Sequence, residues 1–339
     1  MTTDAIAGSD YAALRLTVRS AGLMRPRPGW YGTKIAVNLL LLAVGWAAFA
    51  LIGRSWWQLL TAAFLAVGYT QTGFIGHDAG HRQITGSRRA DDVIGRLHGN
   101  LLIGLSYGWW IAKHNRHHAY PNQVGRDPDI AGNAIAFAPE HARARRRAGI
   151  WLARCQAWLF FPMLLLEGWH LHAASIRVLL RRRGVKVRLA EASMLAVHVA
   201  GYLGVLFWLL SPAQAVAFLV VHQGLFGVYM GSSFAPNHKG MAMFRPGDQV
   251  DYVRRQVLSS RNIRGGPVTD FALGGLNYQI EHHLFPSMPR PNLRLARGVV
   301  RAFCTRHGIR YCETDLLSSY AQVLRHLNTV GGLRPDLEY

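Results

Sequence analysis

Residues 57–81 read WQLLTAAFLAVGYTQTGFIGHDAGH, an apolar run that ends in two histidines four positions apart. About 20 predominantly apolar residues are enough for a helix to cross the hydrocarbon core of a bilayer, and lipid leaves the backbone few alternatives to a helix. Residues four apart on a helix share a face, so His77 and His81 point in one direction beyond the apolar run. The stretch therefore predicts a membrane-spanning helix at about 57–76 with paired imidazoles just past one end.

Three further stretches are long and apolar enough to span a bilayer. They lie at about 35–53, 192–210 and 213–233. The links around Arg54 and around Ser211 are only a few residues long, so the four spans form two hairpins. Basic residues cluster in the central segment, whereas the two links contain only Arg54. Because positive charge favours the cytoplasmic side, we predict an all-α integral membrane protein whose N-terminal segment 1–34, centre and C-terminal third face the cytoplasm.

Two other apolar segments are predicted not to cross the membrane but to lie in its interface or to enter and leave it on the same side. Residues 151–169 contain an arginine, a proline and a glutamate and have an arginine cluster on each side. A single crossing would carry one of those clusters to the far side, which favours an interfacial position. Residues 97–112 are shorter and end in two tryptophans, a residue type that anchors at the headgroup level. No internal repeat or separate soluble domain is apparent, so one domain is expected over 35–339.

The composition argues against several other classes of protein. Hydrophobic residues make up 50% of the chain, and the formal net charge is +20, from 38 Lys and Arg against 18 Asp and Glu. The basic residues lie between hydrophobic segments and not along an aromatic-interleaved stripe, which favours membrane lipids over nucleic acid as a partner. Cys155, Cys304 and Cys312 form no C-x-x-C pair, so they indicate no disulfide framework.

Two more histidine groups accompany the first one. HNRHH begins just after the 97–112 segment and QIEHH lies in the C-terminal third, and each places polar side chains at i, i+3 and i+4 on one helix face. Imidazole suits iron, zinc, copper and nickel, and seven histidines exceed what one ion normally binds, so we predict two metal ions. A structural zinc site would usually recruit cysteine and stop at four ligands. The predicted ligands are His77, His81, His114, His117, His118, His282 and His283.

The histidine groups agree with the topology, because all three lie on the predicted cytoplasmic side. Metal-bound histidines usually donate their second ring N–H to an acceptor. Asp78 and Glu281 adjoin the groups and are candidates for this role, with plain solvation as the alternative for each. His222 lies within a predicted span, where we expect a hydrogen bond from helix to helix.

The order and spacing of the three histidine groups resemble those of the membrane fatty acid desaturase family. QIEHHLFP, with glutamine at the first position of the third group, is similar to the front-end and linoleoyl-CoA-type branch. The resemblance extends from about Ile35 to Pro289 and implies that 35–339 is the desaturase domain. It also implies a further metal ligand just after the fourth span, where SSFAPNHKGM supplies His238. For Gln279 it leaves three roles: binding metal through its carbonyl, acting through a water, or only hydrogen-bonding a ligand.

The resemblance also implies a reaction, cofactors and partners. A member of this family would use two iron ions and O2 to introduce a cis double bond into a fatty acyl chain, carried as acyl-CoA or acyl-lipid. HPGG, the haem motif of a cytochrome b5 domain often fused in this branch, does not occur in this chain. Electrons are therefore expected from a ferredoxin or free cytochrome b5-type donor with its reductase. The alternatives are a lipid or hydrocarbon hydroxylase on the same scaffold and a membrane metal transporter, which would place its ligands near the bilayer midplane.

Overall fold

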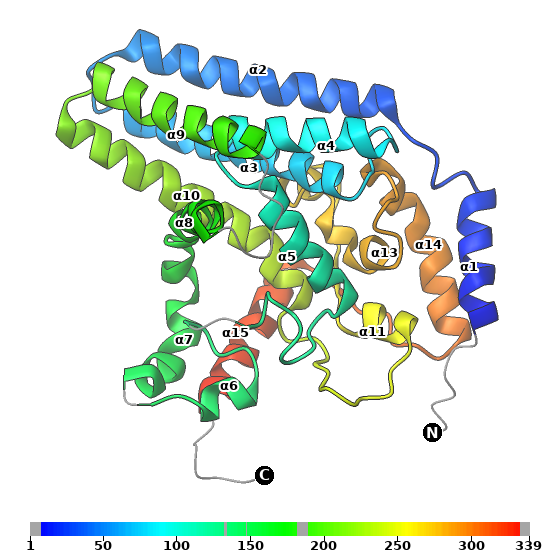
Figure 1. The fold of residues 1–339 in the computed structure, drawn as a ribbon. Helices are drawn as coiled ribbons and strands as arrows, with labels where there is room; N and C mark the ends of the chain where they lie inside the picture. Colours follow the sequence, from blue (N-terminus) through cyan, green and yellow to red (C-terminus); the bar gives the residue numbers. More distant parts are fainter. Residues whose placement is uncertain (1–7, 132–133, 147, 182–188, 333–339) are drawn as a thin grey trace. The chain divides into compact units, whose positions relative to one another are not determined.

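The computed structural model describes residues 8–131, 134–146, 148–181 and 189–332, and the chain is mostly helical (Figure 1). Its contacts divide it into two compact units. The first, called here the membrane unit, comprises Pro26–Ala112 and Phe161–Ser232. The second, called the histidine-rich unit, comprises the described parts of Met1–Arg25, Lys113–Phe160 and Ser233–Tyr339.

The membrane unit contains the long apolar helices. Its elements are α2 (Pro28–Ile52), α3 (Gln58–Gly80), α4 (Arg88–Arg96), the π-helix η1 (Leu97–Leu102), α8 (Glu167–Arg181), α9 (Leu189–Leu209) and α10 (Pro212–His238), whose last turn belongs to the other unit. Among the described residues four helices are long and apolar enough to span a membrane: α2, α3, α9 and α10. Each overlaps one predicted span, although α2 begins at Pro28, before the predicted start, and α10 continues to His238.

Close backbone approach and polar pairs join the helices of the membrane unit. A Cβ at Gly45 of α2 would press into Leu65 of α3, so glycine lets the two helices approach. Asn38 of α2 donates to the backbone oxygen of Gln71 at 2.8 Å. A hydrogen bond of 2.6 Å joins the Tyr202 hydroxyl on α9 to Nδ1 of His222 on α10, the helix-to-helix contact expected for that histidine. Pairing of this kind removes the cost of a polar group in lipid.

The two segments predicted to be interfacial are both broken. Residues 151–169 fall on α7 (Ala148–Leu164) and the start of α8, and the two helices meet at a bend of 77°. This bend corresponds to a broken span or a re-entrant segment, and glycines Gly168 and Gly227 let α8 pack against the backbone of α10. Residues 97–112 are divided between η1 and the start of α5 (Tyr107–Ala119), so they form no single helix.

The histidine-rich unit consists of shorter helices around one hydrophobic core. Besides α5 and α7, its elements are α1 (Gly8–Ser20), α6 (Pro139–Arg143), α11 (Tyr252–Leu258), β1 (Asn262–Ile263), α12 (Pro267–Ala272), the 3-10 helix η2 (Leu276–Tyr278), α13 (Gln279–Leu284), α14 (Arg290–Arg306), β2 (Glu313–Thr314) and α15 (Leu316–Gly332). Buried residues of α1, α11, α13 and α14 form the core. The strands pair in parallel over two residues, a small correction to the predicted all-α class. This core fixes α13, which carries the third histidine group.

Candidate metal centre

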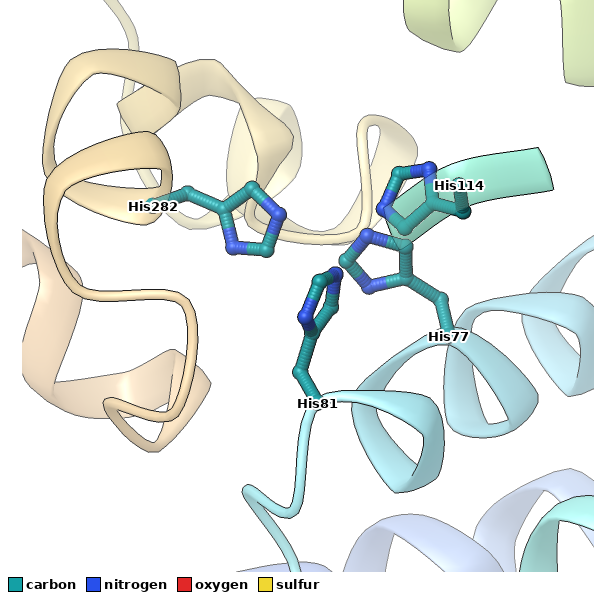
Figure 2. Close-up of side chains that lie close together, drawn as sticks. All are labelled: His77, His81, His114 and His282. Atoms are coloured by element: carbon teal, nitrogen blue, oxygen red, sulfur yellow. The ribbon is translucent and has the colours of Figure 1, made fainter. Parts of the chain in front are cut away.

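The first histidine pair lies at the end of α3 in the membrane unit. His77 and His81 are buried, and their ring centroids are 4.7 Å apart. Nδ1 of His77 lies 3.3 Å from the carboxylate of Asp78, as expected for an acid that orients the imidazole. Trp110 lies beside the pair, with its ring 5.4 Å from that of His77. Figure 2 shows the rings of His77 and His81 on adjacent turns at the end of the helix.

The other predicted ligands all lie in the histidine-rich unit. The second group lies on α5, His238 is the last residue of α10, and the third group lies on α13. Nε2 of His117 lies 3.3 Å from Nε2 of His238, and Nε2 of His114 lies 3.1 Å from that of His118. The rings of His118 and His283 stack at 4.2 Å. Helices far apart in the sequence therefore bring these histidines together within one compact unit.

Three of these histidines have their Nδ1 atoms engaged by oxygen acceptors. Nδ1 of His117 lies 3.0 Å from each carboxylate oxygen of Asp127. Nδ1 of His238 lies 2.9 Å from the backbone oxygen of Ser259, and Nδ1 of His283 lies 2.8 Å from the side-chain oxygen of Gln256. Since these oxygens can only accept, each Nδ1 carries a proton, and in the neutral form of each ring Nε2 presents a lone pair.

The resulting lone pairs fit a metal ion. One ligand atom from each of His117, His238 and His283 lies within 4.8 Å of the others, and all three side chains are buried. Two unprotonated Nε2 atoms at 3.3 Å repel each other, and either a proton on one of them or a metal ion bound to both removes the repulsion. A divalent metal removes that repulsion and is the ion that neutral imidazoles prefer. The donor set therefore fits the predicted metal.

Asp127 is the main orienting group and was not predicted from the sequence. Besides His117, its carboxylate accepts from the backbone N–H groups of Asn122 and Asp129, both at 2.8 Å. Asn122 in turn donates to the backbone oxygen of His238 at 3.0 Å. Burial lowers the pKa of His117, but the charges of Asp127 and Asp129 outweigh burial and leave that pKa raised. The sequence feature that could have identified Asp127 is the DPD stretch that follows the second histidine group.

The remaining two predictions for polar neighbours have different outcomes. Gln279 is buried, and its Nε2 lies 2.8 Å from Nε2 of His238, so its amide lies against a candidate ligand. The prediction that Glu281 orients an imidazole is wrong. Its carboxylate accepts from Asn262 at 2.7 Å and from the Tyr311 hydroxyl at 2.8 Å. Burial raises the pKa of Glu281 to about 7, although those two hydrogen bonds oppose the rise.

A buried arginine supports the end of α10 that carries His238. The guanidinium of Arg261, which is fully buried, donates to the backbone oxygen of Pro236 at 2.6 and 3.0 Å and to that of Lys239 at 3.0 Å. It also donates to the side chain of Gln322 at 2.7 Å. Positive charge is favourable at a helix C-terminus, where carbonyl groups lack helical partners. Arg261 therefore stabilises the turn that positions His238.

The chain is similar in sequence to known fatty acid desaturases. The family pattern described as fatty acid desaturase matches residues 54–315. The chain is 30% identical over 340 residues to a Delta(5) fatty acid desaturase of Caenorhabditis elegans, covering 96% of this chain and 75% of that protein. It is 29% identical over 333 residues to an acyl-lipid (9-3)-desaturase of Physcomitrium patens. That match covers 95% of this chain but 62% of the moss protein, so the chain spans less than two thirds of that relative.

The match of the family pattern covers well over half of the chain and includes all three histidine groups and the intervening spans. The long apolar helices are those of an integral membrane protein. Taken with the buried imidazoles, these findings show that this chain belongs to the fatty acid desaturase family of oxidoreductases.

Proposed function

We propose that this chain is an O2-dependent fatty acyl desaturase that introduces a cis double bond with a pair of iron ions. The observation that carries the proposal is the convergence of three buried Nε2 lone pairs, from His117, His238 and His283. This set suits one ion. The geometry alone would fit other metals that favour imidazole, and membership of the desaturase family favours iron.

We further propose that the other predicted ligands, His77, His81, His114, His118 and His282, bind a second ion. His118 belongs to the same centre, since its ring lies 4.2 Å from that of His283 and 4.8 Å from that of His282. Gln279 would hydrogen-bond a ligand or offer its carbonyl oxygen to a metal. All eight histidines are thereby assigned, and the two ions would lie close together.

The chain's own part in the reaction is to orient the ligands and position the substrate. Bound iron supplies the oxidising power that removal of hydrogen from an unactivated methylene requires, which no side chain can provide. Asp127, Gln256 and the Ser259 carbonyl hold three rings with Nε2 facing inward. Burial of those rings keeps water from competing for the same positions.

The topology of the protein is part of the proposal. The four spans would form two hairpins, with both termini and all three histidine groups on the cytoplasmic face. In a cysteine-free background, a cysteine at Gly29 should react only with reagent added on the cytoplasmic side, and a cysteine at Ser211 only from the other side. Labelling of Ser211→Cys from the cytoplasmic side would rule out this orientation.

A separate acidic electron donor would dock on the basic cytoplasmic face. We propose Arg181, Arg182 and Arg183 as part of this face; Arg181 ends α8, and the other two lie outside the described residues. Complementary charge mainly speeds encounter and is screened by salt. Turnover should therefore require an added ferredoxin or cytochrome b5 with its reductase, and the apparent donor KM should rise with ionic strength. Turnover with NAD(P)H alone would contradict this part of the proposal.

Lipid analysis of a desaturase-deficient host that expresses this chain tests the function directly. A new cis double bond is expected, and its position reports the regiochemistry at the same time. The variant His117→Ala should abolish the product and lower bound iron, whereas His170→Ala, a change at an exposed histidine on α8, should do neither. A hydroxylated chain as the only product would indicate a hydroxylase, and metal flux into vesicles without lipid oxidation would indicate a transporter.

A further inference from the structure

A cavity of about 200 Å³ lies beside the third histidine group, within the histidine-rich unit. Its lining includes basic and aromatic side chains. Arg15 and Arg19 of α1 line it together with the rings of Tyr11, Tyr252 and Phe285. Ser287 adds a hydroxyl at the same cavity. The cavity takes no part in the metal site described above.

The two arginines are held at the cavity by the helix that carries them. They are four residues apart on α1, so they lie on one face of it. The neighbouring face is fixed, because Leu14 and Val18, each one residue before an arginine, are buried in the core of this unit. Both arginine side chains are exposed. No described acidic residue pairs with either one or lines the cavity, so the local charge is positive and open to a ligand.

The lining residues favour an anionic group with several oxygen acceptors. Arginine matches the oxygens of phosphate with paired N–H donors and keeps its charge at any physiological pH. The volume is below the roughly 300–1,000 Å³ of sites that enclose a whole small-molecule ligand. The cavity therefore has room for a phosphate group and its immediate attachment, while the rest of such a molecule would lie outside.

Two tyrosines connect the cavity to the segment that carries candidate metal ligands. The Tyr252 hydroxyl donates to the backbone oxygen of His283 at 3.2 Å. The Tyr11 hydroxyl donates to the backbone oxygen of Leu284 at 2.9 Å, and the rings of the two tyrosines are 5.2 Å apart. Two residues that line the cavity with Arg15 and Arg19 are thus hydrogen-bonded to the backbone of a candidate metal ligand and of the residue after it.

We propose that Arg15 and Arg19 bind a phosphate group of the molecule that carries the acyl chain. This inference rests on the proposed desaturase function and narrows its substrate to phosphate-bearing carriers. A phospholipid headgroup and the phosphates of coenzyme A share the chemistry that the cavity recognises. Binding there holds the polar end of the substrate beside α13, and the acyl chain extends from it toward the candidate metal ligands.

The test compares two double variants of equal charge change in the full-length protein. Arg15→Gln with Arg19→Gln removes the cavity charges. Arg301→Gln with Arg306→Gln removes two exposed charges of α14 that do not line the cavity and serves as the control. Calorimetric titration in nanodiscs of uncharged lipid uses three probes: coenzyme A, a short-chain phosphatidylglycerol and inorganic phosphate. Thermal unfolding of each variant checks that the fold is retained.

The cavity variant should weaken binding of coenzyme A, phosphatidylglycerol or both on the order of tenfold, because hydrogen bonds to a charged group are lost. The control variant should bind as the wild type does. In turnover, KM for the same acyl chain on the responding carrier should rise in parallel while kcat stays the same. The probe that responds identifies the carrier as coenzyme A or phospholipid.

Equal weakening in both variants would show a general effect of charge and overturn the proposal. Binding of inorganic phosphate without binding of either carrier would also overturn the proposal, because the site would then bind only a free ion. If the wild type forms double bonds but the variant without Arg15 and Arg19 binds the carrier as tightly as the wild type does, this inference is contradicted and the desaturase function is not. A wild type that binds a carrier through the arginines but forms no double bond contradicts the function instead.

Discussion

The hydrogen bond between Asp127 and His117 can be weakened by a substitution that keeps the shape of the side chain. In Asp127→Asn one carboxylate oxygen becomes an NH2 group. The wild-type carboxylate accepts from Nδ1 of His117 and from the backbone N–H groups of Asn122 and Asp129. The amide retains one accepting oxygen, so its NH2 must face one of these donors. Either the loop shifts or His117 loses the partner that keeps its Nε2 unprotonated.

The expected loss of metal affinity follows from these contacts. A hydrogen bond to a charged group contributes about 1.5–3 kcal/mol, and 1.4 kcal/mol corresponds to tenfold in an equilibrium constant. Asp127→Asn should therefore weaken the binding of one iron about 10- to 100-fold, in the range found when an acceptor behind a metal-bound histidine is removed. The second iron should be affected less, because His77 and His81 lie on another element with Asp78 as the neighbouring acid.

The assay is competition between the iron-loaded protein and a chelator, with thermal unfolding of the metal-free protein measured alongside. Asp251→Asn is a matched control, since Asp251 accepts from the backbone N–H of Arg254 at the start of α11, where asparagine caps as well as aspartate. Asp127→Asn should release iron more readily than the control. If both variants hold two irons with wild-type affinity, or if Asp127→Asn loses iron only because the metal-free protein unfolds, the orienting role assigned to Asp127 is refuted.

Two further predictions concern stability. A Cβ at Gly331 of α15 would overlap the backbone oxygen of Ala153 on α7, so Gly331→Ala should destabilise the protein by about 1–3 kcal/mol in thermal or chemical unfolding. Gly332→Ala, where nothing lies within 4 Å of the new Cβ, should be neutral or slightly stabilising, and equal effects of the two changes would contradict this packing. Burial lowers the pKa of His98 in the folded state, so the unfolded chain binds a proton first as the pH falls below about 6.5, and stability should drop there. His98→Gln should flatten the dependence of the unfolding temperature on pH over that interval, and parallel curves would contradict the assignment.

The spans were predictable because length and apolarity are properties of the sequence alone, but their ends were not. The predicted first span starts near Ile35, where the continuous apolar run starts, whereas α2 starts at Pro28. Gly32, Thr33 and Lys34 lie in that extra length and interrupt the hydrophobic run without interrupting the helix. Proline at the first turn is favourable for helix initiation. Hydropathy therefore reports the part of a helix that suits lipid, and helix propensity and capping determine the rest.

The histidines of one group are close together in the sequence, whereas the groups that orient them lie much further along the chain. Within each histidine group the spacing is three or four residues, so the common face is visible in the sequence. The acceptors are 10, 21 and 27 residues from His117, His238 and His283. One of the three, the carbonyl of Ser259, is a backbone atom that any residue supplies.

Those acceptors can be placed only when α11 and the 120–130 loop have packed against the ligand helices. A substitution at Ser259 that keeps the backbone in place should therefore leave iron binding unchanged. Gln256 is different, because its side-chain oxygen meets His283 while its NH2 donates to the backbone oxygen of His118 at 3.0 Å. That donor fixes the orientation of the amide, so the carbonyl must face the imidazole. One side chain thereby ties the second and third histidine groups together, a link between α5 and α13 that neither sequence motif contains.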